Sequence, residues 1–390
     1  MESNFKVTLI GTLPPIKGIS PYCKELLISL SSNTPVEFIG FKKLYPDFLY
    51  PGGRSTEDDI LESHITIDNT EIRNTLTYYN PFSWIIAGLT CKGDIIHAQW
   101  WSHVLAPVFI TILLLCKLRG KKVVITIHNI LPHEANRLNA ILNRAVLHLG
   151  DHFIVHSERN VAQSHNTLGI PITKISRIPI GIINDVDEIH VPQSVAKEKL
   201  HIPQEKKVIL FFGHIREYKG LEVLLEAFSI VIQQDPNLFL VIAGTPWKNE
   251  QHYVNLIQKY NIGSQCKAYL HFVPSNETSL FYSASDVVVL PYIEFSSQSA
   301  VGAVALAYEK PLIVTDVGGL SEYVKDRRCL VPPKSPKNLA EAILSITRDE
   351  NLLQKLALDS KSIAQDCSWT SVAERTVATY KRILTAGCRQ

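Results

Sequence analysis

Short, uniformly apolar segments alternate along the chain with longer segments whose apolar positions recur at helical spacing. The apolar segments lie at 6–11, 36–40, 94–98, 123–128, 152–157, 207–213, 239–244, 268–273, 286–292 and 311–316. Strands that are apolar throughout, rather than at every second position, are typical of parallel sheets with helices on both faces. Between them, residues 138–149 and 221–232 carry apolar side chains three and four positions apart, which predicts helices with one buried face. The alternation therefore predicts an α/β protein with doubly wound, parallel sheets.

A polar segment divides the apolar segments into two groups of five. It contains two prolines, and we interpret residues 184–204 as a linker. This predicts one Rossmann-like domain over 1–183 and a second over 205–365, in line with the usual size of a domain. The tail predicts one more helix, over residues 368–386.

The composition narrows the classes of function. The chain has 390 residues, of which 46% are hydrophobic and 19% charged, so it is not an extended disordered protein. Its 39 basic and 37 acidic residues give a net charge of +2, which does not indicate a nucleic-acid-binding protein. The seven cysteines include no CxxC pair, which argues against a disulfide framework or structural zinc and favours a reducing, cytoplasmic setting.

Three segments bear on secretion and membranes. The first residues, MESNFKVTLIG, resemble a first strand, because they lack the basic start and apolar core of a signal peptide. The longest apolar run, Val104 to Leu115, is interrupted by Pro107 and is too short to span about 30 Å of hydrocarbon. We interpret this run as a buried helix. The basic helix predicted over 134–149 is expected to pack on the core, with docking on anionic lipid as the alternative.

Ligands of open α/β sheets bind beyond the carboxyl ends of the strands. After the first strand, Gly18 precedes a predicted helix whose free N–H groups could bind an anion, although an ordinary strand–helix turn is the alternative. The dinucleotide fingerprint GxGxxG and the Walker loop GxxxxGK(S/T) are both absent. Their absence argues against an NAD enzyme and a P-loop enzyme.

A basic loop follows the first strand of the second domain. Gly213, His214, Arg216 and Lys219 all precede a predicted helix there. Cations beside a helix N-terminus indicate a diphosphate site, and a solvated basic loop is the alternative. The start of a later helix of small residues offers N–H groups and a hydroxyl to a polar ligand, or a simple N-cap, at Gln298, Ser299, Ala300 and Val301.

Histidines end two buried strands at the same predicted edge of the first sheet. His97 and His128 could exchange a proton or hydrogen-bond a sugar hydroxyl there, although an isolated histidine is more often structural. Trp100 and Trp101 follow His97, and these three side chains are our candidates for the acceptor side. HExxH is absent and the remaining histidines lack metal-ligand spacing, so we predict no metal site.

These motifs together resemble the retaining glycosyltransferases of the GT-B fold, specifically glycosyltransferase family 4, also described as glycosyl transferases group 1. The most specific segments are GHIREYKGLEVLLEAF at 213–228 and ALAYEKPLIVTDVGGLSEYV at 305–324. TIHNILPHE at 126–134 agrees in position. The tail is similar to the last helix of the family, which crosses back onto the first domain. The resemblance implies two Rossmann-like domains that face a central cleft.

The resemblance also implies roles for single residues. Gly18 would lie against the donor diphosphate and His128 near the transferred sugar. Lys219 would bind the donor phosphates, with Arg216 beside it. We therefore assign catalytic roles to His128, Lys219 and Arg216. The donor site implied by the resemblance and the motifs comprises Gly18, Gly213, His214, Lys219, Gln298, Ser299, Ala300 and Val301.

The chain departs from the family at three positions. His214 stands where an arginine is usual, and Ser296 and Val304 replace two glutamates that contact the donor sugar and its ribose. A catalytically weak protein that binds a nucleotide sugar or a partner enzyme is therefore an alternative to an active transferase. A sugar-nucleotide epimerase on the same fold is a further alternative.

For an active enzyme, the resemblance implies hexosyl transfer from a nucleotide diphosphate sugar to a hydroxyl of a sugar or lipid-linked acceptor, with retention of configuration. We expect no cofactor and no dedicated metal besides this donor, and no nucleic-acid partner. The family context implies synthesis of surface polysaccharide, glycolipid or lipid-linked oligosaccharide. A cytoplasmic protein is expected, with peripheral contact at the inner face of the membrane left open.

Overall fold

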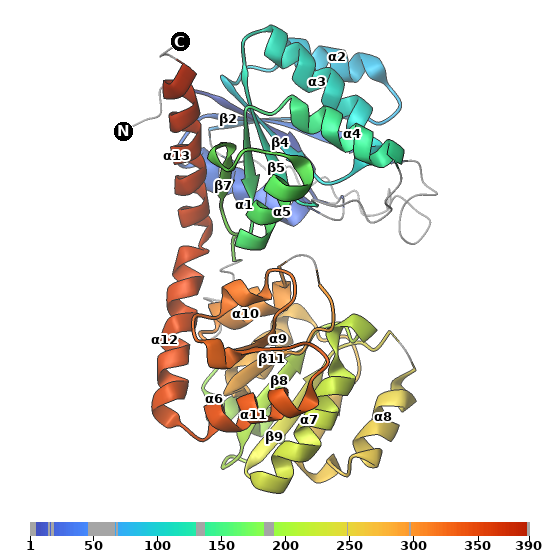
Figure 1. Cartoon of the computed structure of the whole chain (residues 1–390), viewed down its shortest axis with the longest axis vertical. Helices are drawn as coiled ribbons and strands as arrows, with labels where there is room; N and C mark the ends of the chain where they lie inside the picture. The colour runs from blue at the N-terminus through green and yellow to red at the C-terminus, as the bar shows by residue number, and fades with distance from the viewer. Residues whose placement is uncertain are drawn as a thin grey trace. The chain divides into compact units, whose positions relative to one another are not determined.

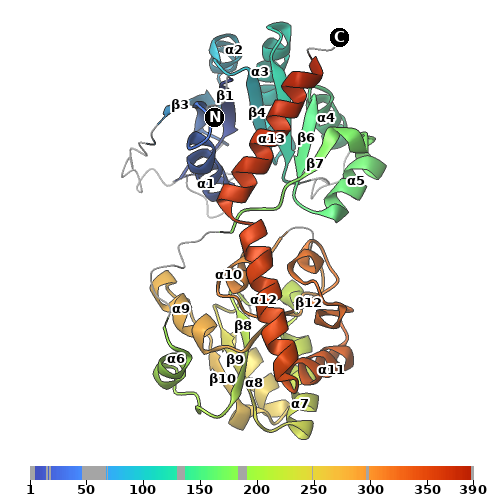
Figure 2. The same cartoon turned by 90° about the vertical axis from the view of Figure 1, so that its left-hand side faces the viewer.

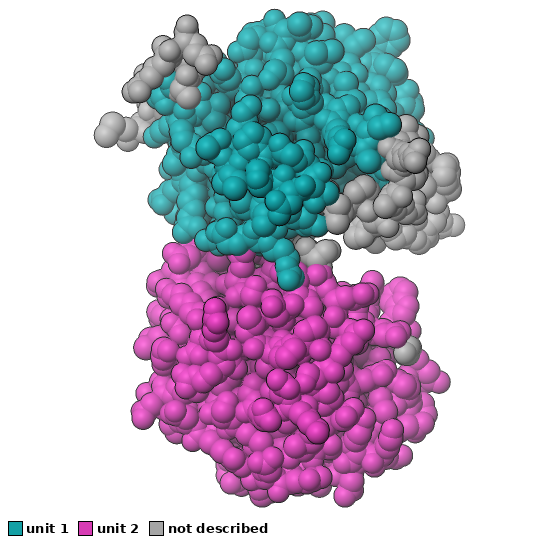
Figure 3. Space-filling model, viewed as in Figure 1, with its two compact units in different colours: residues 1–181, 369–390 teal, residues 182–368 magenta. Residues whose placement is uncertain are grey.

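A computed structural model of the chain (Figures 1 and 2) describes residues 5–14, 16, 19–45, 67, 69–129, 137–182, 191–247, 249–295 and 298–387. The chain divides into two compact units, which are coloured separately in Figure 3. Unit 1 comprises residues 1–181 and 369–390, and unit 2 comprises residues 182–368. Each unit contains one wholly parallel sheet with helices on both faces. The expected class, two Rossmann-like α/β domains, is confirmed.

The sheet of unit 1 has seven described strands in the order β3-β2-β1-β4-β5-β6-β7. They are β1 Val7–Gly11, β2 Val36–Lys43, β3 Thr70–Thr77, β4 Ile95–Trp100, β5 Lys122–Ile127, β6 His152–Val155 and β7 Ile175–Arg177. Strand β1 pairs with both β2 and β4, so the strand order reverses at this point. In a doubly wound sheet, the carboxyl ends beside such a reversal are the usual ligand site.

Helices cover both faces of this sheet and bury two separate apolar cores. The helices of unit 1 are α1 Ser20–Ser31, α2 Pro81–Thr90, α3 Ala106–Leu118, α4 Arg137–His148, α5 Glu158–Leu168 and α13 Trp369–Gly387, with the 3-10 turns η3 His103–Leu105 and η4 Ile172–Lys174. One core lies under α2, α3 and α4, and the other lies under α1 and α13. The tail helix α13 buries Val372, Ala373 and Tyr380 in this second core. The expected return of the last helix to the first domain is therefore confirmed.

The sheet of unit 2 has six described strands in the order β10-β9-β8-β11-β12-β13. They are β8 Lys207–Phe212, β9 Leu238–Ala243, β10 Cys266–Tyr269, β11 Val287–Leu290, β12 Leu312–Thr315 and β13 Leu330–Val331. The helices are α6 Gln193–Lys199, α7 Leu221–Gln234, α8 Glu250–Lys259, α9 Ser275–Ala284, α10 Ala300–Ala307, α11 Pro336–Thr347 and α12 Glu350–Asp366, with the 3-10 turns η6 Glu217–Lys219, η7 Gly263–Gln265, η8 Leu320–Tyr323 and η9 Arg327–Cys329. The strand order reverses at β8, between β9 and β11.

Three strands were not expected from the sequence: β3, β7 and β13. All three lie at an edge of their sheet. An edge strand has one neighbour and can remain partly exposed, so it does not need a continuous apolar segment. Strand β3 has the sequence TEIRNTLT, in which only the last two side chains are buried. The apolar pattern therefore finds the interior strands and misses the polar or short edges.

The predicted linker at 184–204 is wrong in its second half. Helix α6 lies within it, and Ala196, Leu200 and Ile202 are buried in the core of unit 2. Residues 191–204 are therefore part of the second domain, because their sparse apolar side chains pack against α9 and its neighbours. Residues 184–190 lie outside the described part of the chain.

The longest apolar run forms most of α3, but this helix is buried on one side only, since Val104 and Leu114 of the run are exposed. Val108, Phe109 and Ile112 are buried in the core of unit 1. Within the described ranges, no helix combines the length and the apolar character needed to cross a bilayer.

Candidate functional site

Three histidines come together in unit 1, two of them just after a strand and His97 in the middle of β4 rather than at its expected end. His97 lies on β4, His128 follows β5 and His156 follows β6. His128 Nε2 lies 2.9 Å from Gln99 Oε1, and His128 Nδ1 lies 3.4 Å from His156 Nε2. Gln99 Nε2 lies 3.2 Å from His97 Nε2. His97 and His128, which the sequence placed at one edge, thus belong to one hydrogen-bonded histidine cluster.

The hydrogen bonds of the histidine cluster define where its protons lie. His156 Nδ1 donates to the Ile178 carbonyl oxygen at 3.0 Å, so its Nε2 is an acceptor. His128 Nδ1 is then the donor between the two rings, which makes His128 Nε2 an acceptor. We assign the Gln99 amide nitrogen to face His128, since amide oxygen and nitrogen exchange by a 180° rotation. The amide oxygen then accepts from His97 Nε2, and all three imidazoles are neutral.

Burial keeps the histidine cluster uncharged. It lowers the pKa of His97 to about 3 and that of His156 to about 4, and it holds the pKa of His128 well below its usual value. The Tyr380 hydroxyl lies 2.5 Å from His97 Nδ1. Burial also raises the pKa of Tyr22, whose ring lies edge-on to His128 with centroids 4.9 Å apart. The histidine cluster is therefore uncharged and offers no charge to a phosphate.

Two of the acceptor-side candidates lie in the protein interior. His97 is 0% exposed, and Trp100 is 2% exposed with its Nε1 donating to Asn143 Oδ1 at 2.6 Å. The reason is that β4 continues to Trp100, two residues beyond the expected strand. As they lie, His97 and Trp100 offer no surface to an acceptor, so this expectation is corrected. Trp101 is partly buried and donates to the Tyr45 hydroxyl at 3.1 Å.

In unit 2, the basic loop between β8 and α7 is fastened to the neighbouring strand ends. Backbone hydrogen bonds of 2.7–2.8 Å join it to the segments after β9 and β11, in the pairs Gly213–Ala243, Ile215–Thr245 and Ile293–Tyr218. The loop then makes the 3-10 turn η6 and enters α7 at Gly220. These bonds hold the loop across the carboxyl ends of β9, β8 and β11.

Lys219 is a buried cation in this loop. Its side chain is 8% exposed, and Nζ lies 5.4 Å from the centre of the Tyr292 ring. A Cβ atom on Gly213 would lie 3.3 Å from Nζ, so the ammonium group is beside the Gly213 backbone. In the part of the chain that the structure describes, Nζ has no hydrogen bond and no carboxylate partner, and the tip of the side chain keeps some contact with solvent. Burial, with a smaller contribution from Arg216, lowers the pKa of Lys219 to about 8.

A second buried lysine of unit 2 shows the usual arrangement. Lys197 is 6% exposed, and its Nζ donates to two backbone carbonyl oxygens, at 2.7 and 3.3 Å. Buried charges are normally paired or hydrogen-bonded in this way, because desolvation is costly. Lys219 departs from this rule at the carboxyl edge of the sheet, which is where a ligand is expected.

The other two basic residues of the loop are on the surface. His214 and Arg216 are exposed, and the Arg216 guanidinium lies 4.6 Å from the centre of the exposed Trp247 ring. The structure therefore brings Arg216 close enough to Lys219 to affect its pKa, but only Lys219 is held inside the site.

The first turn of α10 completes the candidate anion site of unit 2. A Cβ atom on Gly213 would lie 3.0 Å from Val301 Cγ2, so this turn lies against the loop. Ser299 is the N-cap and is 4% exposed; its hydroxyl accepts from an N–H of the first turn at 3.4 Å and lies 2.9 Å from the Tyr292 hydroxyl. Ser299 is therefore a cap with an occupied hydroxyl, and the donors left for a ligand are backbone N–H groups. Gln298 precedes the cap and Ala300 begins the helix.

Several expectations remain predictions. Gly18 and Ser296 lie outside the described residues. Among the described side chains, no group of three or more His, Cys, Asp or Glu residues is placed to hold a metal ion. That transfer needs no dedicated metal stays a prediction.

Sequence reasoning missed His156, Gln99 and Tyr292. His156 ends β6 in the same way that His128 ends β5, so the rule that selected His128 also selects His156. Gln99 lies two positions after His97 on one strand, which places both on the same face. Tyr292 follows β11 at the edge where Lys219 lies, but nothing in the sequence indicates that its ring faces the ammonium group.

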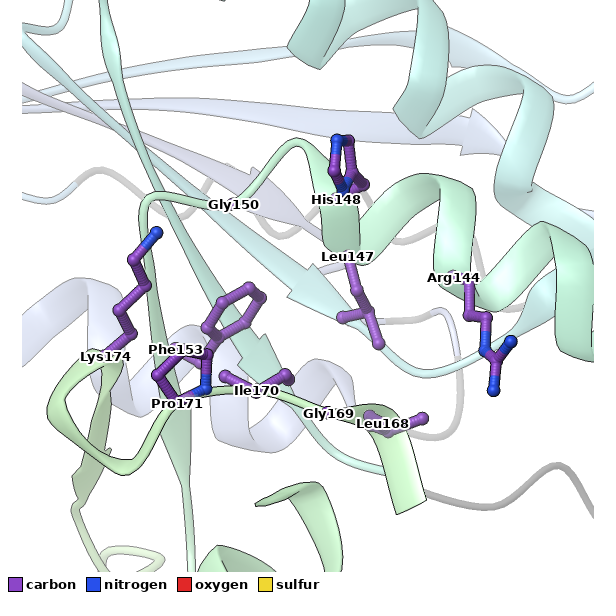
Figure 4. A pocket seen from close by; sticks show the side chains of 10 residues that line it. All are labelled: Arg144, Leu147, His148, Gly150, Phe153, Leu168, Gly169, Ile170, Pro171 and Lys174. Atoms are coloured by element: carbon purple, nitrogen blue, oxygen red, sulfur yellow. The ribbon is translucent and has the colours of Figure 1, made fainter. Parts of the chain in front are cut away.

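A pocket of about 430 Å³ lies elsewhere in unit 1 (Figure 4). It is formed by the end of α4, the start of β6 and the segment after α5, and its lining includes the basic residues Arg144, His148 and Lys174. These segments lie at the amino end of β6, opposite to the edge that carries the histidine cluster. None of the site residues expected from the sequence lines this pocket.

Comparisons with known families agree with the motifs and the fold. The family described as Glycosyltransferase Family 4 matches residues 47–185, and the family described as Glycosyl transferases group 1 matches residues 193–362. The chain is of the glycosyltransferase family 4 type. The two matches fall on the two sheets in turn, so this protein of family 4 type carries both parts of the expected GT-B fold.

Individual relatives are more distant. An uncharacterized glycosyltransferase of Methanocaldococcus jannaschii is 29% identical over 189 residues, which is 47% of each chain. A D-inositol 3-phosphate glycosyltransferase of Corynebacterium diphtheriae is 29% identical over 191 residues, 46% of this chain and 44% of the relative. The chain thus spans about half the length of the curated relatives that it matches.

Solved structures share the fold over nearly the whole chain. Anabaena HepE in complex with UDP has a TM-score of 0.71 at 16% identity, with 97% of this chain and 100% of HepE covered. Sucrose-phosphate synthase from Thermosynechococcus elongatus has a TM-score of 0.66 at 20% identity, with 98% and 99% covered. At these identities the likeness shows the GT-B fold alone.

Proposed function

We propose that this protein transfers a glycosyl group from a nucleoside diphosphate sugar to an acceptor hydroxyl, with retention at the anomeric carbon. The observation that carries the proposal is the buried ammonium group of Lys219, which has no anionic partner among the described residues. The family matches support the reaction class, and the UDP bound to the structural relative HepE supports a nucleotide donor.

The surroundings of Lys219 suit a diphosphate. Lys219 Nζ lies beside the Gly213 backbone, and the first turn of α10 lies against the same glycine. The N-terminus of a helix carries partial positive charge and free N–H groups, which favour a bound phosphate. A diphosphate would give the ammonium group the counter-charge that it lacks, so binding would raise the pKa of Lys219 from about 8 toward its ordinary value.

The difficult step of the reaction is breaking the bond between the sugar and the diphosphate. The leaving group gains negative charge as this bond breaks, and a fixed cation stabilises that charge without reorganising. In this proposal Lys219 supplies the cation and Arg216 adds to the local field. The acceptor proton passes to the departing phosphate on the same face of the sugar, which gives retention and needs no dedicated metal.

His128 has a different part in the proposal. Its pKa is well below neutral because it is buried, so its ring is uncharged at pH 7. Gln99 and His156 already engage both ring nitrogens. Because both nitrogens are occupied, His128 is not assigned to covalent attack. The resemblance places it near the transferred sugar, which its partly exposed ring can contact without a hydrogen bond. We place the reaction in the synthesis of surface polysaccharide, glycolipid or lipid-linked oligosaccharide, as the resemblance implies.

The test is the Lys219→Met variant, assayed for nucleotide release from a panel of UDP, GDP and ADP sugars with mixed acceptors. Methionine keeps the shape of the side chain and removes its charge. We expect turnover to fall by at least about tenfold, equivalent to about 1.4 kcal/mol of transition-state stabilisation. Lys197→Met is the matched control, because it removes an equally buried ammonium group away from the site, and its turnover should change by less than about twofold.

Three results would contradict the proposal. Unchanged turnover of Lys219→Met would remove the lysine from the mechanism. Nucleotide-sugar binding by the wild type without turnover on every acceptor would favour a binding protein, the alternative that the missing glutamates motivate. Conversion of the donor sugar without an acceptor would indicate an epimerase.

A further inference from the structure

Helices α2 and α3 of unit 1 are unusually poor in charge for helices at a surface. Together they contain 23 residues, 10 in α2 and 13 in α3, and the one charged residue among them is Lys117. A surface helix normally has an apolar stripe toward the core and polar side chains outside. The two helices lie side by side (Figures 1 and 2) and bury their inner faces against each other and the sheet.

Large apolar side chains also cover the outer faces of these two helices. On α2, Phe82, Ile85, Ile86 and Leu89 follow the spacing of one helical face, and they are 72%, 39%, 58% and 52% exposed. On α3, two further apolar side chains one turn apart are 46% and 76% exposed, Leu114 and Leu118. We call these six residues the outer α2–α3 face. Six exposed large apolar side chains on two adjoining helices are unusual for a monomeric protein and indicate a candidate binding surface.

The inner side of α2 shows that this exposure is not a packing defect. Ala87 is buried, and a Cβ atom on Gly88 would lie 2.9 Å from Leu115 Cβ of α3. The two helices are therefore in close contact along small residues. The inner side of helix α2 is therefore fully packed against α3, so the apolar residues on its outer side are not needed for packing within unit 1.

A basic rim borders the outer α2–α3 face where both helices end. The Arg119 guanidinium donates to the Gly88 carbonyl oxygen at 2.9 Å, which fixes it between the two helix ends. Lys117 pairs with Asp151 at 2.8 Å and Lys121 with Asp94 at 3.7 Å. The whole rim has six cations and three carboxylates, a net charge of +3: Lys6, Lys92, Lys117, Arg119, Lys121 and Lys122 against Glu71, Asp94 and Asp151.

We infer that the outer α2–α3 face docks on a bilayer containing anionic lipid. An apolar helix face at the depth of the acyl boundary, with cations at the level of the headgroups, is the arrangement of an interfacial membrane anchor. The long lysine and arginine side chains of the rim can reach the headgroups while Leu118 and Leu89 lie deeper. The neighbouring helix α4 adds the exposed Ile141, and it carries Arg144, whose side chain lines the pocket of Figure 4.

The charge of the rim distinguishes a bilayer from a second copy of the chain. In a two-fold dimer the same surface is present on both subunits. Two rims of net positive charge would repel each other wherever the two-fold axis brings the helix ends together, whereas anionic headgroups attract the rim. Helix α4 packs on the core through Val146 and Leu147, which was the favoured expectation for the helix 134–149. The proposed lipid-facing surface therefore lies mainly on α2 and α3.

The test is flotation of the full chain with phosphatidylcholine vesicles, with and without phosphatidylglycerol. We expect the wild type to float with the anionic vesicles, and less so as salt rises. Ile86→Glu and Leu118→Glu should each weaken binding by at least about tenfold, since each places a charge in the acyl region. Leu358→Glu is the matched control: Leu358 is 67% exposed on α12 of unit 2, and its variant should float like the wild type.

A separate variant tests how much the charge of the basic rim contributes to vesicle binding. Lys92→Gln combined with Lys121→Gln should weaken binding to anionic vesicles and leave the apolar face unchanged. Circular dichroism checks that every variant is folded. Equal loss in Ile86→Glu and Leu358→Glu, or equal binding of the wild type to neutral and anionic vesicles, would overturn the inference. The inference would also be overturned if the wild type bound no vesicle. It would equally be overturned if the wild type self-associated instead and Ile86→Glu abolished that association.

Discussion

The two units carry ionisable groups at the same edge of similar sheets, but they satisfy them in opposite ways. In unit 1, three histidines are neutral and every ring nitrogen has a hydrogen-bond partner. In unit 2, Lys219 is a buried cation with no hydrogen bond to a described residue. The histidine cluster is complete without a ligand, whereas the lysine site lacks the anion that would complete it.

This difference indicates how each sheet edge contributes to stability and to ligand binding. A fully hydrogen-bonded network stabilises one arrangement of side chains and resists change. An unpaired buried cation costs stability in the free protein, and that cost is recovered when an anion binds. Lys219 satisfies the rule for buried charges only through the residual solvent contact of its ammonium group, which an anion can replace.

The largest effect that we predict is acid destabilisation of unit 1. An unfolded histidine binds a proton near pH 6.5, but His156 in the folded unit does so only near pH 4. The unfolded state therefore holds more protons between these values, and the free energy of unfolding falls as pH falls from about 6.5 to 4. His156 alone contributes about 3 kcal/mol to this loss, and the even lower pKa of His97 adds to it.

Hydrogen exchange measured by mass spectrometry at pH 7 and pH 5 would report each unit separately. After correction for intrinsic exchange, core peptides of unit 1 should lose protection before those of unit 2. His156→Gln should reduce this pH dependence. The control is His201→Gln, because His201 is exposed in unit 2. An equal pH dependence in both units would show that the histidine cluster is not what sets acid stability.

A second prediction compares two glycines that have the same backbone conformation but different surroundings. Gly169 of unit 1 has a φ of 70° and Gly220 of unit 2 a φ of 68°. A Cβ atom on Gly169 would meet nothing within 4 Å, so Gly169→Ala should cost about 1 kcal/mol for the left-handed conformation alone. On Gly220 it would lie 2.0 Å from the Pro291 carbonyl oxygen, so Gly220→Ala must move the backbone and should cost about 3 kcal/mol or more.

Urea unfolding measures both costs, and nucleotide binding gives a second readout. Gly220→Ala should also weaken UDP binding, since Gly220 follows directly on Lys219 and ends the loop that holds it. Gly169→Ala should bind like the wild type. Similar costs for the two variants would mean that the loop of unit 2 is not fastened to β11 as the structure shows.

The sequence allowed the interior of both sheets to be predicted, because interior strands must be apolar on both faces. The edge strands β3, β7 and β13 were missed, since an edge can be polar or short. Helix α6 was mistaken for a linker because its few apolar side chains become meaningful only when the core that they enter is known. The pattern of apolar residues along the chain therefore predicts strands that are buried on both faces, but it does not predict elements that are only partly buried.

The candidate site was predictable to a similar extent. Glycines bracketing a basic loop indicated Lys219, but the loop contains three basic residues and its sequence does not say which one is buried. Trp100 was misplaced because a strand boundary was set two residues too early. That Lys219 lacks a partner depends on residues far apart in the chain, such as Tyr292, and no spacing in the sequence encodes it.

The last prediction concerns the stability of two lysine variants rather than their activity. Lys219→Met removes an unpaired buried charge, and we expect the free energy of unfolding at pH 7 to rise by about 2 kcal/mol. Lys197→Met removes an ammonium group that donates to two carbonyl oxygens and leaves these oxygens unsatisfied. This variant should lower the free energy of unfolding by about 1 kcal/mol or more. Two equally buried lysines of one unit should therefore respond with opposite sign.

The pH dependence sharpens this last comparison. Folded Lys219 loses its proton near pH 8 and the unfolded side chain near pH 10.5, so the unfolded state holds more protons between these values. The stability contribution of this lysine therefore rises with pH across that window, and the advantage of Lys219→Met should disappear by about pH 10. Urea unfolding at pH 7 and pH 10 measures the change. A variant that is less stable than wild type at pH 7 would show that Lys219 is already satisfied in the free protein, and the proposed anion site would lose its physical basis.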